Sequence, residues 1–358
     1  MSRRHWVRAA IYVVLLLALV GGRGFMLAQA LGGRYPLSEL VFDVAALGLI
    51  IVGLRLFDAG VKRGLARLIP QDTRLRRGAT RTLHALIVLG VGFPFLLVTL
   101  QFHPQRIAPG GTPKNVGLDY RDVAFTADGL RLSGWFIPAR EPRRPVVLVA
   151  HGFNANKENF LLPIVLVNQL GYDALLFDFR AHGASGGRAS TFGLKEAADV
   201  KAAHDWIRRT HPGRPVYALA YSMGASATVH AAAAHGLFER RVLDSTFGDL
   251  ERVARATLLR PFGPLARPLW NVGRFWGWVW TGADVDRHRP ERVIRALADR
   301  PLLLIHGTRD RLIPHTETLR LYEATGRRAE LWLVPDRDHV QTVDHPEYRD
   351  RLRAFFAS

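Results

Sequence analysis

The chain has 358 residues, 49 of them basic and 31 acidic, and a formal net charge of +18. It contains no cysteine, which excludes thiol catalysis, disulfide bonds and cysteine-ligated metals. It also lacks a Walker-type phosphate loop and a His-Glu-x-x-His pair. Nucleotide hydrolysis and zinc peptidase chemistry therefore have no support, and we expect neither a cofactor nor a metal.

The first part of the chain holds three apolar runs, Ala9–Gly22, Leu40–Leu54 and Leu83–Leu100. About 18 nearly uncharged residues in the third run suffice for a helix of roughly 27 Å at about 1.5 Å per residue. The second run contains Asp43 and needs flanking residues to reach across a bilayer. We predict that residues 1–104 form a membrane region with about three transmembrane helices.

The basic residues of this region set the expected orientation. Residues 1–104 hold 13 basic and 4 acidic side chains, a net charge of +9. Basic residues precede the first run and crowd the segment between the second and third runs, which predicts that both segments are cytoplasmic. Three crossings then leave the rest of the chain outside the cytoplasm, at a bacterial inner or cell membrane. The basic residues in question are Arg3, Arg4, Arg8, Arg55, Lys62, Arg63, Arg67, Arg74, Arg76, Arg77 and Arg81.

Two other interpretations of this region remain open. A basic start followed by an apolar core of about 14 residues is also typical of a cleaved signal peptide. The basic segment 55–82 could bind nucleic acid, but its position between apolar runs favours anionic lipid headgroups. We therefore expect membrane lipids as partners and no nucleic acid.

A short linker follows and leads into a segment of alternating strands and helices. The prolines and adjacent glycines of His103–Asn115 predict a linker over residues 105–119. Residues 120–358 alternate apolar strands with helical stretches, which predicts an α/β fold with a mostly parallel sheet covered on both faces. The expected strands are 121–126, 130–137, 146–150, 173–178, 216–220, 241–244, 302–306 and 330–334, the first two forming a hairpin. The expected helices are 157–170, 193–210, 223–235, 290–299, 316–325 and 346–357.

The segment around Ser222 has the pattern of a nucleophile elbow. An apolar strand ends at Ala220, and an alanine-rich helix starts at Met223. Small residues two before and two after the serine suit the strained strand-turn-helix that exposes a nucleophile. The first of them is Ala220 where glycine is more usual, and the second is Gly224.

A serine hydroxyl needs an imidazole to take its proton and a carboxylate to orient that imidazole. Asp310 follows an apolar strand, and His339 lies in a loop between the last strand and the terminal helix, which gives the chain order Ser, Asp, His. Asp244, at the end of an earlier strand, is the alternative acid. His345 is the alternative base, although the proline after it is typical of a helix entry.

Residues from about 120 to the end resemble an α/β-hydrolase, and are similar to membrane-associated serine hydrolases of the serine aminopeptidase and monoglyceride lipase kind. The segment Val146–Phe160, a strand ending in His-Gly, is similar to the family's oxyanion segment. The resemblance implies that the N–H groups of Phe153 and Met223 form the oxyanion hole. The segment Asp178–Gly187 resembles a further family loop, to which we assign no catalytic step, and we expect His151 and His182 to be structural.

An insertion of nearly sixty residues separates the strand ending at Asp244 from the next one. We predict a cap over Ser222 formed by residues 245–300. Its centre carries four of the eight tryptophans, Trp270, Trp276, Trp278 and Trp280. They either pack the cap onto the body, or line an acyl-binding wall or rest at a bilayer interface, where tryptophan is favoured.

These patterns together predict a membrane-anchored serine hydrolase that cleaves esters, thioesters or amides through an acyl-enzyme, with a small or lipid-like acyl substrate. Two alternatives stay open at this point. An acyltransferase would use the same three residues with another acceptor in place of water. A catalytically silent binding protein on a hydrolase fold would not react with a serine-directed probe.

Overall fold

The computed structural model describes residues 74–87, 101–104, 106–140 and 145–358, with short pieces between 52 and 67. The chain divides into two compact units, Met1–Leu89 and Gly90–Ser358. The predicted apolar runs lie outside the described residues, apart from a few positions of the second and third. Among the residues that are described, no helix is both long and apolar enough to cross a membrane. In the first unit the structure describes one long helix, α3 (Arg74–Ile87).

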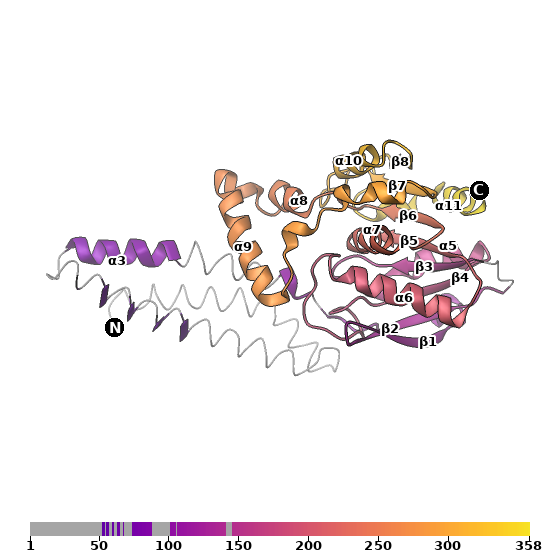
Figure 1. The fold of residues 1–358 in the computed structure, drawn as a ribbon, viewed down its shortest axis with the longest axis horizontal. Coiled ribbons are helices and arrows are strands. Elements are labelled where there is room, and N and C mark those ends of the chain that lie inside the picture. The colour runs from indigo at the N-terminus through magenta and orange to yellow at the C-terminus, as the bar shows by residue number, and fades with distance from the viewer. Residues whose placement is uncertain are drawn as a thin grey trace. The chain divides into compact units, whose positions relative to one another are not determined.

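An eight-stranded sheet forms the centre of the second unit, in the order β1-β2-β4-β3-β5-β6-β7-β8 (Figure 1). The strands β3 to β8 run parallel, whereas β2 is antiparallel to both β1 and β4. Their bounds are β1 Arg121–Ala127, β2 Leu130–Ile137, β3 Val146–Ala150, β4 Asp173–Phe177, β5 Val216–Tyr221, β6 Arg240–Asp244, β7 Leu302–Gly307 and β8 Glu330–Val334. All eight expected strands are confirmed, with differences of one residue at some ends.

The hairpin of β1 and β2 turns at Asp128 and Gly129, both with positive φ (49° and 76°). A tight two-residue hairpin turn needs two consecutive residues with positive φ, and the pair Asp-Gly adopts this conformation at low steric cost. The central strands β3 and β4 are buried at every position, as expected for a sheet covered on both faces, and the sequence of β3 is apolar throughout.

Helices cover the sheet on both faces, and each face has its own apolar core. One core contains side chains of α6 (Glu196–Thr210), α7 (Met223–His235) and α10 (Thr316–Ala324). The other contains side chains of α5 (Leu161–Gln169) and α11 (Tyr348–Ala357). The expected helix 157–170 begins as the 3-10 helix η3 (Lys157–Phe160) before α5.

The insertion between β6 and β7 contains two α-helices, α8 (Leu250–Ala256) and α9 (Ala266–Thr281), joined by the 3-10 helix η4 (Arg260–Leu265). It ends in the 3-10 helices η5 (Val285–Arg287), η6 (Pro290–Arg292) and η7 (Ile294–Leu297). The prediction of an α-helix over 290–299 is therefore wrong. The bonds run from the N–H of Val293 to the carbonyl of Pro290 and from Ala296 to Val293, which is the three-residue spacing of short 3-10 turns.

Candidate active site

Ser222 lies between β5 and α7 on a sharply strained turn. Its φ and ψ are 51° and −119°, a backbone conformation that residues with a side chain rarely adopt. Gly224 allows the turn to fit, because a Cβ there would lie 2.5 Å from the carbonyl oxygen of His151 and 2.6 Å from that of Ala150. Ala220 is fully buried in the sheet beside Ala150, so the structure accommodates its methyl group.

His339 and Asp310 lie next to Ser222 although they are distant from it in sequence. The Oγ of Ser222 is 3.0 Å from Nε2 of His339, and Nδ1 of His339 is 2.6 Å from Oδ2 of Asp310. Asp310 comes from the turn after β7, and His339 from the loop after β8. The carboxyl ends of three parallel strands thus meet at one edge of the sheet and bring the three side chains together.

The hydrogen-bond partners of His339 indicate which of its two nitrogens faces Asp310 and which faces Ser222. Burial favours a higher pKa for Asp310, but the hydrogen bonds from His306 and His339 outweigh it and lower the pKa to about 2. The ionised carboxylate only accepts hydrogen bonds, so Nδ1 of His339 carries the hydrogen and Nε2 is free to accept from the Ser222 hydroxyl. This arrangement can remove a proton from Ser222 and stabilise the resulting imidazolium.

The turn after β3 lies against the serine. A Cβ on Gly152 would be 3.3 Å from the Cβ of Ser222. His151 accepts a hydrogen bond from the N–H of Phe179 and donates from Nδ1 to the carbonyl of Gly152, with its pKa lowered by burial to about 4. The neutral ring therefore holds the turn, in line with the structural role expected for it.

The predicted oxyanion donors, Phe153 and Met223, lie near Ser222. Phe153 and Met223 line the same cavity as Ser222. Met223 is the first residue of α7, and the first amides of a helix have no partner within that helix. The amide dipoles of α7 add a partial positive charge at this end, which favours a negative oxygen there.

A cavity of about 350 Å³ opens beside Ser222. Its walls come from the sheet edge and from α8 and α9, and they are almost entirely apolar. The side chains include Phe102, Phe153, Phe192, Phe247, Leu259, Leu269 and Trp270. Of the four insertion tryptophans, Trp270 lines this cavity, whereas Trp278 is about 55% exposed. The insertion thus supplies one side of a space that fits an apolar group.

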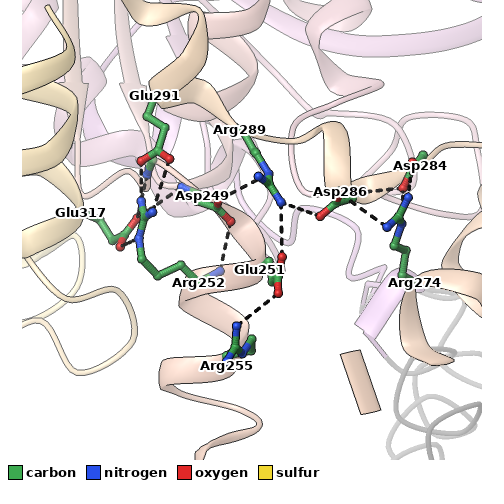
Figure 2. A network of polar contacts seen from close by, with 11 residues as sticks. Asp249, Glu251, Arg252, Arg255, Arg274, Asp284, Asp286, Arg289, Glu291 and Glu317 are labelled. Carbon is green, nitrogen blue, oxygen red and sulfur yellow. Dashed lines mark hydrogen bonds and ion pairs between the residues drawn. The ribbon is translucent and has the colours of Figure 1, made fainter. Parts of the chain in front are cut away.

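The Arg252–Glu317 ion pair holds the insertion to the body, and further ion pairs link parts of the insertion to one another (Figure 2). Arg252 of α8 bonds Glu317 of α10 at 2.5 Å and Glu291 of η6 at 2.6 Å. Glu317 is buried and also accepts from the N–H groups of Gly248 and Asp249, so one carboxylate organises the start of α8. At the other end Arg274 of α9 makes two bonds to Asp284.

The alternative acid and base take other positions. Asp244 is fully buried, and its carboxylate accepts from the hydroxyls of Ser245, Thr342 and Tyr348. Burial raises its pKa, in contrast to that of Asp310. His345 accepts from the N–H of Glu347 at the entry to α11, as the proline after it predicts. The structure therefore brings Asp310 and His339, rather than these two residues, to Ser222.

Sequence reasoning missed two residues of this group. His306, in β7, bonds Oδ2 of Asp310 at 3.0 Å. Asp338 accepts from the N–H groups of Arg311 and His339 and so ties the two loops together. The signal for His306 was its position at the end of a buried strand four residues before the acid.

Comparison with known proteins assigns the family. The family model described as "Alpha/beta hydrolase family" matches residues 146–349. This chain belongs to the α/β-hydrolase family. Its expected fold, a mostly parallel sheet with helices on both faces, is thereby confirmed.

Relatives of this α/β-hydrolase include bacterial proteins of uncharacterized function. The protein YfhR of Salmonella typhi is 28% identical over 309 residues, which cover 80% of this chain and 96% of the relative. An uncharacterized protein of Mycobacterium tuberculosis is 31% identical over 247 residues, covering 66% of this chain and 78% of the relative. Among solved structures, the esterase Pf2001 of Pyrococcus furiosus is 29% identical with a TM-score of 0.57, covering 71% of this chain and 98% of that one.

Proposed function

We propose that the protein is a serine esterase that works through an acyl-enzyme, with Ser222 as nucleophile, His339 as general base and Asp310 as the orienting acid. The observation that carries the proposal is the line of hydrogen bonds from Ser222 through His339 to Asp310, opening on an apolar cavity. The membership in the family and the esterase among its structural neighbours support hydrolysis.

The chemistry follows from the positions of the hydrogens. Nε2 of His339 takes the proton as the Ser222 oxygen attacks the ester carbonyl carbon, and the negative oxygen that develops is held by the N–H groups of Phe153 and Met223. The alcohol then leaves with the proton from His339, and an acyl-Ser222 ester remains. Water enters, gives a proton to His339 and releases the carboxylic acid, which restores the Ser222 hydroxyl as the proton returns.

The cavity indicates the class of substrate. Apolar walls with few polar groups bind an apolar acyl chain through burial of its surface, at about 25 cal/mol per Å². We therefore assign carboxylic esters with an extended apolar acyl group as substrates, in preference to aminoacyl amides, whose ammonium group would lose its hydration in such walls.

A panel of nitrophenyl esters of graded chain length, with aminoacyl nitroanilides alongside, tests this assignment. We expect kcat/KM to rise with acyl length, to be lowest for the aminoacyl substrates, and to vanish in Ser222→Ala. Faster turnover of aminoacyl substrates than of any ester would contradict the substrate class. Ester hydrolysis retained by Ser222→Ala would contradict the nucleophile.

We further propose that the protein is anchored in a membrane by its N-terminal apolar runs, with the hydrolase unit outside the cytoplasm. The charge distribution of residues 1–104 supports this orientation. The cavity offers independent support. Gln101 and Phe102 line the cavity and directly follow the third apolar run in the sequence. If that run crosses a bilayer, the chain leaves the bilayer within a few residues of the cavity.

The exposed face of α9 and the residue before it also suit a bilayer surface. Leu265, Phe275, Trp278 and Val279 are about half exposed or more, and no acidic residue occurs between Glu251 and Asp284. Aromatic side chains with basic neighbours are favoured at the headgroup level of anionic membranes. Such a surface would place the cavity where a lipid-like ester resides.

The lack of native cysteine gives a clean test of orientation. Arg327→Cys, at an exposed position of the hydrolase unit, and Gly78→Cys, in the basic segment, are treated with a membrane-impermeant maleimide. We expect Arg327→Cys to react in intact cells and Gly78→Cys to react only after permeabilisation. The reverse pattern would contradict the orientation, and recovery of the protein in the soluble fraction would contradict the anchor.

A further inference from the structure

The carboxylate of Asp310 is held by four donors. Its Oδ1 accepts from the N–H groups of Leu312 at 2.9 Å and Ile313 at 2.7 Å. Its Oδ2 accepts from His339 at 2.6 Å and from His306 at 3.0 Å. Two imidazoles therefore share one oxygen, and the side chains of both His306 and Asp310 are fully buried.

The partners of His306 show which ring nitrogen faces the acceptors. Nε2 of His306 also lies 2.9 Å from the carbonyl oxygen of Ile313, and both neighbours of this nitrogen accept but do not donate. Nε2 therefore carries the hydrogen. Nδ1 lies 2.6 Å from the hydroxyl of Thr318, which is closer than the 3.4 Å from that hydroxyl to the carbonyl of Thr246. The Thr318 hydroxyl therefore lies within hydrogen-bond distance of both Nδ1 of His306 and the carbonyl oxygen of Thr246.

This geometry limits how the carboxylate can move. The backbone N–H groups of Leu312 and Ile313 hold Oδ1 of Asp310 in place. These two hydrogen bonds alone would still let Oδ2 move by rotation of the carboxylate. His306 approaches Oδ2 from β7, a strand that is buried at every position, whereas His339 approaches from a loop after β8. A donor on the strand therefore sets the direction in which Oδ2 faces His339, and Thr318 of α10 holds the ring in place through Nδ1 at 2.6 Å.

We propose that His306 is a positioning residue of the esterase, which acts through Asp310 to aim the His339 imidazole at Ser222. The inference rests on the proposed function, because it assigns the active orientation of an acid that only that function requires. His306 does not touch substrate. Its loss leaves substrate binding intact and lowers the rate of proton removal from Ser222.

Two amide substitutions separate positioning from packing. In His306→Gln the side-chain amide nitrogen can reach the place of Nε2 and still donate to Asp310. In His306→Asn the shorter amide reaches only the place of Nδ1, facing Thr318, and Asp310 loses its donor. Both variants bury a neutral amide of similar polarity at the same site. The same pair of substitutions at His204, on α6 away from the site, is the matched control.

We expect His306→Asn to lower kcat about 10- to 100-fold, as a small misplacement of a catalytic group does, with KM changed by less than about 2-fold. His306→Gln should recover most of that loss, and both His204 variants should keep wild-type kcat. Equal kcat in His306→Asn and His306→Gln, whether both are impaired or both normal, would overturn the inference, as would a loss confined to KM.

A third variant covers the case in which the amide variants do not fold. Thr318→Val keeps His306 but removes the hydroxyl that holds its ring through Nδ1, so kcat should fall several-fold at constant KM. Wild-type kcat in Thr318→Val would overturn the inference. Ser222→Ala measured alongside distinguishes the two levels of the argument. Activity retained there contradicts the esterase itself, whereas activity lost there with kcat unaffected by His306→Asn contradicts only the role of His306.

Discussion

Gly224→Ala is the change whose consequence follows most directly from the geometry of the elbow. Gly224 has no positive φ to preserve, so the added methyl group acts through space alone. Its Cβ would lie 2.5 Å from the carbonyl oxygen of His151 and 2.6 Å from that of Ala150. An ordinary contact there needs at least about 3.4 Å, so α7 and the end of β3 must move apart by nearly 1 Å.

That movement separates the parts that must meet in the reaction. Ser222 and Met223 travel with α7, whereas Phe153 follows β3, so the nucleophile and one oxyanion donor lose their alignment. A misplacement of about 1 Å costs about 100-fold in rate. Overpacking of a buried site costs about 1–3 kcal/mol of unfolding free energy, which a domain of this size tolerates.

The assay combines steady-state ester hydrolysis with urea unfolding of the same samples. We expect kcat/KM to fall about 100-fold while the protein stays folded at 25 °C. Gly110→Ala is the matched control, because a Cβ there meets its nearest atom, Oε2 of Glu158, at 3.9 Å. Normal kcat/KM in a folded Gly224→Ala protein would refute the reasoning that the close approach of elbow and β3 holds the oxyanion geometry.

Three further predictions follow from burial and charge. Burial lowers the pKa of His151 to about 4, so the unfolded state binds more protons between pH 6.5 and 4. Stability present above that window is lost as pH falls through it, by about 3 kcal/mol for this residue, and urea unfolding that is unchanged from pH 7 to 5 would contradict this. Arg252→Met removes a cation from the buried Glu317 carboxylate and should lower the free energy of unfolding by about 3 kcal/mol. Adding Glu317→Gln to Arg252→Met should restore part of that free energy. A double variant as unstable as Arg252→Met alone would count against the ion pair. Trp270→Ala should reduce turnover of long-chain esters more than that of short ones, whereas Trp278→Ala should leave both unchanged in solution. A larger effect of Trp278→Ala than of Trp270→Ala on long-chain esters would contradict the placement of the acyl group in this cavity.

The sheet and the three residues around the elbow could be predicted because their signals are local. A parallel strand buried on both faces is a short unbroken apolar run, and such runs marked β3 and β7 almost to the residue. Ser222 can be identified in the sequence by the small residues that the turn requires. Asp310 and His339 follow from their position after strands whose carboxyl ends share one edge.

The insertion and the supporting residues His306 and Asp338 could not be predicted in the same way. The sequence of α9 contains proline, glycine and several aromatic residues, which weaken its helical pattern, and its position depends on ion pairs such as Arg274 with Asp284. His306 and Asp338 act through partners that only the folded chain brings near. A buried histidine in a strand looks the same in sequence whether it fills space or orients an acid.

The central claim is that Ser222 carries the acyl group during turnover. The most direct measurement is to quench the enzyme during hydrolysis of a slow ester, or after reaction with a fluorophosphonate, and to locate the added mass by peptide mass spectrometry. The account predicts one adduct per chain on the peptide containing Ser222, none in Ser222→Ala, and greatly slowed formation in His339→Ala. An adduct on another residue, or labelling that persists in Ser222→Ala, would contradict it.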